Sequence, residues 1–238
     1  MTDSTDIDAS PLRPAPVRTP DAQATKRNII EIATREFAQN GLSGARVDEI
    51  AAKTACSKRM IYYYFGDKEG LYLNVLEEAY RRVRRIEATL DLDHLPPLDA
   101  IRALAGFTFD HHHSNDDFIR LVMIENIHHG DYLERSNVIQ SLNATAIDTL
   151  ERLVARGVRE GVFRAGLGAI DLHWQISALC FFNVSNRATF SKIFRHDLHS
   201  APAQARLRER VVDTIVRYVV RHPLLDQPQE PHSTPAPG

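Results

Sequence analysis

Cysteine is scarce in this chain. Its 238 residues include only two, Cys56 and Cys180, which lie far apart and in no metal-binding spacing. A disulfide framework and a structural zinc site both need more closely associated cysteines, so neither is expected, and a reducing compartment is indicated. Cys56 is most simply a small residue in a turn, since a redox role would need a thiolate stabilised by a cation such as Lys58.

Long apolar runs and a dominant sign of charge are also missing. No stretch of about 18 apolar residues occurs, so no membrane span and no membrane partner are expected. The segment MTDSTDIDASPLRPAPVRTP lacks the apolar centre of a secretory signal, which favours a cytoplasmic protein. The formal net charge of −2 excludes a uniformly basic nucleic-acid coat but permits a local basic face.

The alternation typical of β-hairpins is absent, and apolar residues recur at helical spacing, which predicts an all-α protein. Residues 1–24 and 223–238 are rich in proline and poor in large apolar residues, so we expect disordered tails there. The expected helices span about 25–40, 47–54, 57–65 and 67–90, followed by candidates near 98–113, 116–128, 131–160, 170–195 and 203–221.

Two short helical segments separated by a tight break stand out near the N-terminus. The first spans about 47–54, Ala55 and Cys56 form the break, and Ser57 is a suitable N-cap for the second. This order is the helix-turn-helix arrangement, in which the second helix enters the major groove of DNA.

The second short helix carries three consecutive tyrosines, which separate by their angle around the helix axis. Ile61 and Phe65 define the core side, and Tyr64 leans toward them. The opposite side presents Lys58, Arg59, Tyr62 and Tyr63. No acidic residue interrupts this segment, so the exposed side offers donors to phosphates and base edges. A small amphipathic helix with exposed tyrosines is the alternative interpretation.

The wider stretch NIIEIATREFAQNGLSGARVDEIAAKTACSKRMIYYYFGDKEGLY resembles the N-terminal domain of the TetR family of transcriptional repressors. The match includes the helix ending in EFAQNG, the segment VDEIAAKTACSK and the block IYYYFGDKEGLY. Family members often carry a hydroxyl residue where this chain has Val47, so one backbone contact is expected to be missing. The resemblance implies DNA contacts from Arg46, Val47, Lys58, Arg59, Tyr62, Tyr63, Tyr64 and Lys68.

The resemblance also implies a function and a domain plan. Residues 25–70 would form a helix-turn-helix DNA-binding domain, and residues 71–222 a helical ligand-binding and dimerisation domain. The expected protein is a homodimeric, ligand-responsive repressor. It would bind a palindromic operator in double-stranded DNA and be released by a small-molecule effector. No cofactor, metal or catalytic residue is expected.

The C-terminal sequence favours a dimer by itself. Near 170–195, one helix side carries Leu172, Ile176, Leu179 and Cys180, and the other carries Trp174, Ala178 and Phe181. A helix that is apolar all round must be covered all round. The last helix is similarly broad in its apolar surface, so we expect these two helices to pair with those of a second copy. A monomeric core is the alternative.

Aromatic side chains near a few polar groups suggest where an effector binds. The candidate ligand-binding residues are Phe109, Glu125, His128, Trp174, Phe181, Asn183, Asn186 and Arg187. Phe107, Phe118 and Phe182 are further candidates for apolar walls. For each aromatic residue, packing in the core remains the competing interpretation, and Arg187 could instead pair with an internal acid.

Two histidine clusters, at 111–113 and 128–129, lie near expected helix C-termini, where cations favour the helix dipole. A metal-dependent enzyme using these histidines is the alternative function, although no HExxH or Cys-His spacing is present. A second alternative is an architectural DNA-binding protein without an effector, which predicts no ligand cavity.

Overall fold

The computed structural model describes residues 22–221, and within them the chain is helical. The predicted tails therefore lie outside the described residues, apart from residues 22–24, which form the first turn of the first helix. In the described part, one isolated bridge between Phe163 and Val220 is the only extended pairing. The prediction of an all-α fold is confirmed. None of the helices described is long and apolar enough to cross a membrane.

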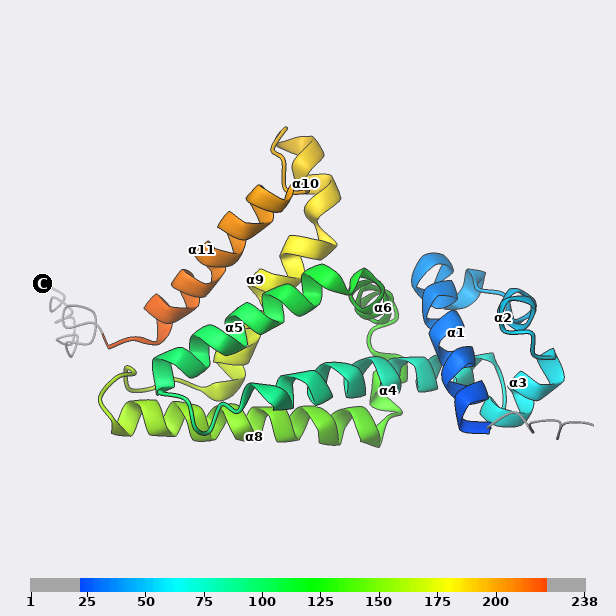
Figure 1. Ribbon diagram of the computed structural model, residues 1–238, viewed down its shortest axis with the longest axis horizontal. Helices are drawn as coiled ribbons and strands as arrows, with labels where there is room; N and C mark the ends of the chain where they lie inside the picture. The colour runs from blue at the N-terminus through cyan, green and yellow to red at the C-terminus, as the bar shows by residue number, and fades with distance from the viewer. Residues whose placement is uncertain (1–21, 222–238) are drawn as a thin grey trace, which may run out of the picture.

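The helices follow one another with short connections (Figure 1). They are α1 (Ala22–Gly44), α2 (Val47–Thr54), α3 (Lys58–Phe65), α4 (Lys68–Glu87), the 3-10 helix η1 (Ala88–Leu90), α5 (Pro97–Ser114), α6 (Asp116–Ile127), α7 (Asp131–Glu134), α8 (Asn137–Arg159), α9 (Ala169–Ser185), α10 (Arg187–Ile193) and α11 (Ala201–Val219). Helices α1–α3 lie together at one end of the molecule, and α4 leads from them into the larger helical body.

Helices α1–α3 and the first turns of α4 enclose one apolar core. Ile29, Ala33 and Phe37 recur at four-residue spacing on α1 and meet Ile50 of α2 and Ile61 of α3, all fully buried. The chain bends at the predicted stop, Gly41, whose φ of 69° favours glycine, and helical structure resumes as far as Gly44. This core also includes α4 residues up to Leu76, so it extends beyond the predicted domain boundary at residue 70.

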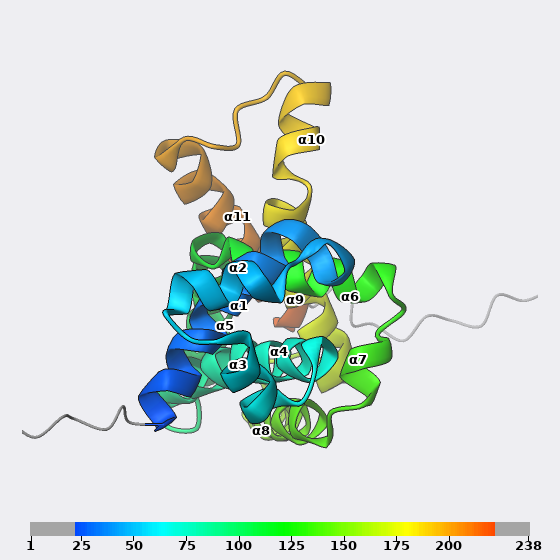
Figure 2. The same ribbon diagram turned by 90° about the vertical axis from the view of Figure 1, so that its right-hand side faces the viewer.

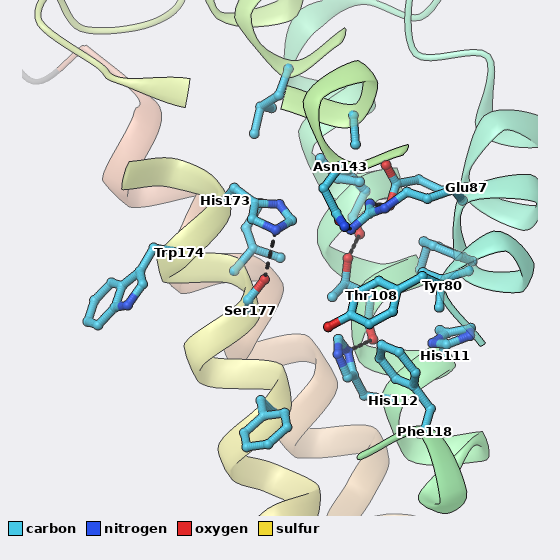
Figure 3. A pocket seen from close by; sticks show the side chains of 18 of the residues that line it. Tyr80, Glu87, Thr108, His111, His112, Phe118, Asn143, His173, Trp174 and Ser177 are labelled. Atoms are coloured by element: carbon cyan, nitrogen blue, oxygen red, sulfur yellow. Dashed lines mark hydrogen bonds and ion pairs between the residues drawn. The ribbon is translucent and has the colours of Figure 1, made fainter. Parts of the chain in front are cut away.

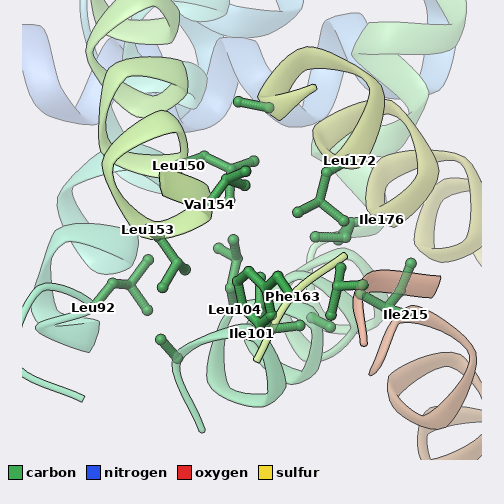
Figure 4. Packing of buried hydrophobic residues seen from close by; sticks show 14 of the residues in the cluster. Leu92, Ile101, Leu104, Leu150, Leu153, Val154, Phe163, Leu172, Ile176 and Ile215 are labelled. Atoms are coloured by element: carbon green, nitrogen blue, oxygen red, sulfur yellow. The ribbon is translucent and has the colours of Figure 1, made fainter. Parts of the chain in front are cut away.

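A second core lies between α5, α8, α9 and α11 (Figure 4). Its buried members include Ile101, Leu104, Leu150, Leu153, Leu172, Ile176 and Ile215. Phe163, in the connection from α8 to α9, packs so closely on Gly157 that an added Cβ there would lie 2.1 Å from the ring. The glycine therefore lets the aromatic ring close the end of this core.

Two helices that were predicted as continuous are each broken in the structure. The predicted segment 131–160 divides into α7 and α8, because the Ser136 hydroxyl accepts a hydrogen bond from the Ile139 N–H and starts a new helix. The same hydroxyl donates to Glu77 of α4 at 2.8 Å. The predicted segment 170–195 divides at Asn186 into α9 and α10.

A buried hydrogen bond links α4 to α6 beside the first core. The Tyr72 hydroxyl on α4 donates to Glu125 Oε1 on α6 at 2.8 Å, and Glu125 Oε2 accepts from the Leu133 N–H at 3.3 Å. The Tyr72 ring also packs edge-on against Phe37 of α1, with centroids 5.1 Å apart. Glu125 is 2% exposed, so its carboxylate ties α4, α6 and α7 together directly beneath α1.

Candidate nucleic-acid interface and ligand cavity

Helix α3 lies at the end of the molecule formed by α1–α3 (Figure 2). Its exposed side is rich in hydrogen-bond donors. Ser57 caps it, because the hydroxyl accepts from the Met60 N–H at 3.2 Å. Ile61 and Phe65 are buried, whereas Tyr63 is 80% exposed and Tyr62 37% exposed. This burial pattern agrees with the predicted division of the tyrosines, and it leaves Tyr63 free to reach a partner.

The two cations of α3 differ in their surroundings. Lys58 Nζ lies 3.0 Å from an Asp48 carboxylate oxygen of α2, and this hydrogen bond raises the pKa of Lys58. Both side chains remain about half exposed, so a phosphate oxygen would compete with Asp48 for the ammonium group. Arg59, on the same face, is exposed.

A buried carboxylate holds the start of α2 against α1. Glu36 is 5% exposed and accepts from the Arg46 backbone N–H, Asn40 Nδ2 and Lys53 Nζ, at 3.3, 3.0 and 3.2 Å. Burial alone would raise the pKa of Glu36, but these donors outweigh it and hold the pKa below its usual value. Glu36 thereby positions the exposed Arg46. Glu36 was not among the residues predicted for the site, although a glutamate among the buried residues of α1 must have hydrogen-bond partners.

The remaining residues predicted to contact DNA differ in their burial and in their contacts. Val47 is 5% exposed and packs in the first core, so its side chain does not belong to the exposed face. Tyr64 is half-buried beneath Lys26, whose Nζ lies 5.2 Å from the ring centroid. Lys68 Nζ donates to the Ser43 carbonyl at 3.1 Å and is partly exposed.

The helical body contains a cavity of about 400 Å³ between α4, α5, α6, α8 and α9 (Figure 3). Apolar and aromatic side chains form much of its wall, among them Leu104, Phe107, Phe118, Val122 and Ile176. Its polar lining residues are Tyr80, Arg84, Glu87, Thr108, His111, His112, Asn126, Asn143, Thr149, His173 and Ser177. A volume of this size suits a compact small molecule.

Arg84 is the one cation of this lining. Its guanidinium is paired with Glu87 and donates from Nη2 to Asn143 Oδ1 at 3.0 Å. Its Nε is buried and has no hydrogen-bond partner. Burial raises the pKa of Glu87 despite the neighbouring guanidinium.

Three histidines from two helices line the same cavity, and each is desolvated. Burial lowers the pKa of His111 and of His173 to about 4, and it also lowers the pKa of His112. His112 Nδ1 lies 2.6 Å from the Thr108 carbonyl, and His173 Nε2 lies 3.5 Å from the Ser177 hydroxyl. His111 Nδ1 is buried without a partner. All three rings are therefore neutral near neutral pH.

Two of the eight predicted ligand-binding residues line this cavity, Trp174 and Phe181. Of the further aromatic candidates, Phe107 and Phe118 line it. Trp174 lies at the rim, because it is 66% exposed and points away from His173 and Ser177 across α9 (Figure 3).

Each of the other six predicted residues lies outside the lining and has a partner elsewhere. Phe109 is in the second core, Glu125 binds Tyr72, and His128 packs edge-on to Tyr132. Asn183 and Gln204 of α11 exchange two amide hydrogen bonds of 2.9 and 3.1 Å. Asn186 caps α9 and donates to Ser185, and Arg187 binds His113 and Asp116.

The sequence interpretation missed His111, His112 and His173 as cavity residues. The first two were assigned to a helix end, where a cation favours the dipole, but the structure turns them inward. The signal for His111 was its spacing from Phe107 and Leu104, which lie one and two turns earlier on the same helix face. In residues 22–221 no group of three or more metal-ligating side chains is placed to hold a metal ion.

Helix α9 leaves an apolar stripe exposed. Ile170, Trp174 and Phe182 are 61%, 66% and 52% exposed, and they recur at multiples of four residues along one face. The apolar residues of α11 pack into the second core instead, and its exposed side is charged. The exposed apolar surface is therefore broad on α9 and narrower on α11, where Leu207, Val212 and Val216 are half-buried.

The cavity histidines predict a loss of stability in acid. Their pKa values are lowered on folding, so the stabilisation of the neutral rings is present above the unfolded-state pKa of about 6.5 and is lost as pH falls toward about 4. Between about pH 7 and pH 5 the unfolding midpoint should fall by on the order of 5 °C. Thermal circular dichroism measures this. The double variant His111→Phe/His173→Phe should show a smaller drop, and an equal drop would assign it to other groups.

A capped helix-turn-helix unit with an exposed, donor-rich second helix, joined to a helical body with an internal cavity, defines a DNA-binding regulator. Comparison with known proteins agrees. Residues 29–75 match the family of bacterial regulatory proteins of the tetR type, and residues 97–215 match the tetracyclin repressor-like C-terminal domain. The chain belongs to the TetR family of transcriptional regulators.

Relatives cover both parts of the chain. It is 34% identical over 189 residues to the HTH-type transcriptional repressor NicS of Pseudomonas putida, covering 79% of this chain and 89% of that protein. It is 36% identical over 112 residues to the repressor SCO4008 of Streptomyces coelicolor, covering 46% of this chain and 54% of that protein.

Solved structures show the same fold. The putative regulator SCO4942 of Streptomyces coelicolor superposes with a TM-score of 0.64 at 25% identity, covering 83% of this chain and 99% of that one. A TetR-family protein from Rhodococcus RHA1 gives a TM-score of 0.65 at 20% identity, covering 83% and 98%. The second likeness concerns the fold alone.

Proposed function

We propose that this protein is a homodimeric repressor that binds a palindromic operator in double-stranded DNA and releases it when a small molecule enters the cavity. The main support for this proposal is that α4 and α6 line the cavity and also pack against α1 of the DNA-binding unit. The names of the relatives NicS and SCO4008, both transcriptional repressors, support repression.

The DNA-binding face is proposed to consist of the exposed side of α3 with Arg46 and Lys68 at its flanks. Lys58, Arg59, Tyr62 and Tyr63 would enter the major groove, while Tyr64 would lie beside the backbone. A single short helix contacts too little DNA for tight and specific binding, so two copies reading two half-sites are required.

Coupling between cavity and DNA would run along α4 and α6. On α4, Tyr80 and Arg84 line the cavity, two and three turns beyond Tyr72, which packs on α1. On α6, Phe118 and Val122 line the cavity, and Glu125, one turn later, accepts the Tyr72 hydrogen bond. A ligand that displaces either helix would change the position of α1–α3, provided that it binds the two arrangements with different affinity.

The proposal is tested by exposing the purified full chain to sheared DNA of the organism that encodes it and sequencing the retained fragments. The expected result is one enriched inverted repeat, whose half-sites are separated by about one helical turn or a multiple of it. Affinity for this repeat should fall steeply with salt, because phosphate contacts release counterions. Retention of fragments without a common sequence would favour the architectural protein, and binding independent of salt would contradict the assigned face.

A further inference from the structure

The unpaired polar atoms at the cavity are both nitrogens. Among the described residues, four buried side-chain nitrogens or oxygens lack a hydrogen-bond partner, and two of these, Arg84 Nε and His111 Nδ1, belong to residues that line the cavity. His111 is 7% exposed, and the side chain of Arg84 is 15% exposed. Buried polar atoms without partners are unfavourable, so a ligand that forms hydrogen bonds with them gains affinity.

Several oxygens at the cavity are engaged with other groups. Glu87 is paired with the Arg84 guanidinium, and Asn143 Oδ1 accepts from Arg84 Nη2. The Thr108 carbonyl, 2.6 Å from His112 Nδ1, is taken by that ring. An acceptor brought by a ligand would satisfy Arg84 Nε, and also His111 Nδ1 in the tautomer that carries its proton there.

The charges at the cavity point to the same class of ligand. Its lining holds one cation, Arg84, and one acid, Glu87, with three neutral histidines around them. Glu87 contacts Nη1 of the Arg84 guanidinium, whereas Nε has no partner and can donate to an incoming carboxylate. A cationic ligand would find no free carboxylate, and it would lie beside Arg84.

We propose that the effector is a compact organic acid: a single carboxylate on an apolar body, whose oxygens accept hydrogen bonds from Arg84 Nε and His111 Nδ1. The apolar part lies against the side chains of Leu104, Phe107 and Phe118. This inference rests on the proposed function, since it names the effector class of the same cavity. The histidine donates from Nδ1 in the tautomer that carries its proton there.

The test compares acids with their neutral amides of nearly equal shape. Benzoate and benzamide form one pair, and 2-naphthoate and 2-naphthamide form a larger pair, each titrated into the full chain by isothermal calorimetry. At least one acid should bind roughly tenfold more tightly than its amide, because only the carboxylate offers a charged acceptor. The His111→Phe variant keeps the aromatic packing and should lose most of this preference.

His113→Phe is the matched control. It makes the same substitution on the same helix, but His113 contacts Arg187 and does not line the cavity, so the acid should bind as tightly as before. Equal or tighter binding of both amides would overturn the acid class while leaving the cavity as an effector site. Failure of both acids to bind at millimolar concentration would also overturn it. The comparison of acid and amide on the unaltered chain stands even where a variant fails to fold.

These titrations use the protein without DNA, so they are independent of the fragment-enrichment experiment. Enrichment of an inverted repeat together with a preference for amides would reject the acid class and keep the regulator. Acid binding without any enriched repeat would reject the proposed function and keep the ligand class.

Discussion

Replacing Tyr63 with alanine should weaken operator binding by roughly 30-fold or more, because a contact of about 1–3 kcal/mol is lost in each half-site of a dimer. Tyr63 is 80% exposed, so its ring contributes little to the core of the DNA-binding unit. The fold and the oligomeric state should therefore be unchanged. A gel-shift titration against the enriched repeat measures the effect, with circular dichroism as the check on folding.

Ile86→Ala provides the control for this variant. Ile86 is also an exposed large residue, 41% exposed, but it lies near the end of α4 that is remote from α3 (Figure 1). Its truncation should leave operator affinity unchanged. Equal affinities of the unaltered protein and Tyr63→Ala would show that α3 does not read DNA through its exposed tyrosine face.

The DNA-binding unit was predictable because its signals are local. A cap at Ser57, a break at Ala55 and the spacing of Ile61 and Phe65 determine which side of a two-turn helix is buried. The structure adds that Ala55 has a positive φ of 52°, which turns the chain between the two helices. Asp48 was not anticipated beside Lys58, since it belongs to the preceding helix and the two meet only after folding.

The cavity was much less predictable, because it depends on how five helices cross. Asn183 was selected as a ligand anchor since a buried amide needs partners, and that physical premise was sound. The partner, however, is Gln204 of α11, which no local pattern reveals. Glu125 was also selected as a ligand anchor, and its partner is again a protein residue, Tyr72, which lies 53 residues away in the sequence. A buried polar residue thus predicts that a partner exists without saying whether it belongs to the protein or to a ligand.

Replacing Trp174 with glutamate should convert the proposed dimer to a monomer and abolish tight operator binding. In a symmetric dimer each substitution occurs twice, and a carboxylate placed on the stripe of Ile170, Trp174 and Phe182 would lose its hydration without gaining a partner. The cost, several kcal/mol for each buried unpaired charge, is comparable with the whole free energy of a modest dimer. Sedimentation velocity measures the change in mass.

The control for this variant places the same charge on an exposed apolar residue elsewhere. Ile127→Glu is suitable, because Ile127 lies on α6 and is 73% exposed. It should remain dimeric and bind the operator as before. If Trp174→Glu still self-associates with unchanged affinity, α9 is not the dimer interface.

The loss of operator binding follows from the loss of the dimer, since a monomer presents one α3 helix and loses the contribution of the second half-site. Linking two Trp174→Glu copies through a long flexible tether should therefore restore part of the operator affinity, because the tether supplies the proximity that the interface no longer provides.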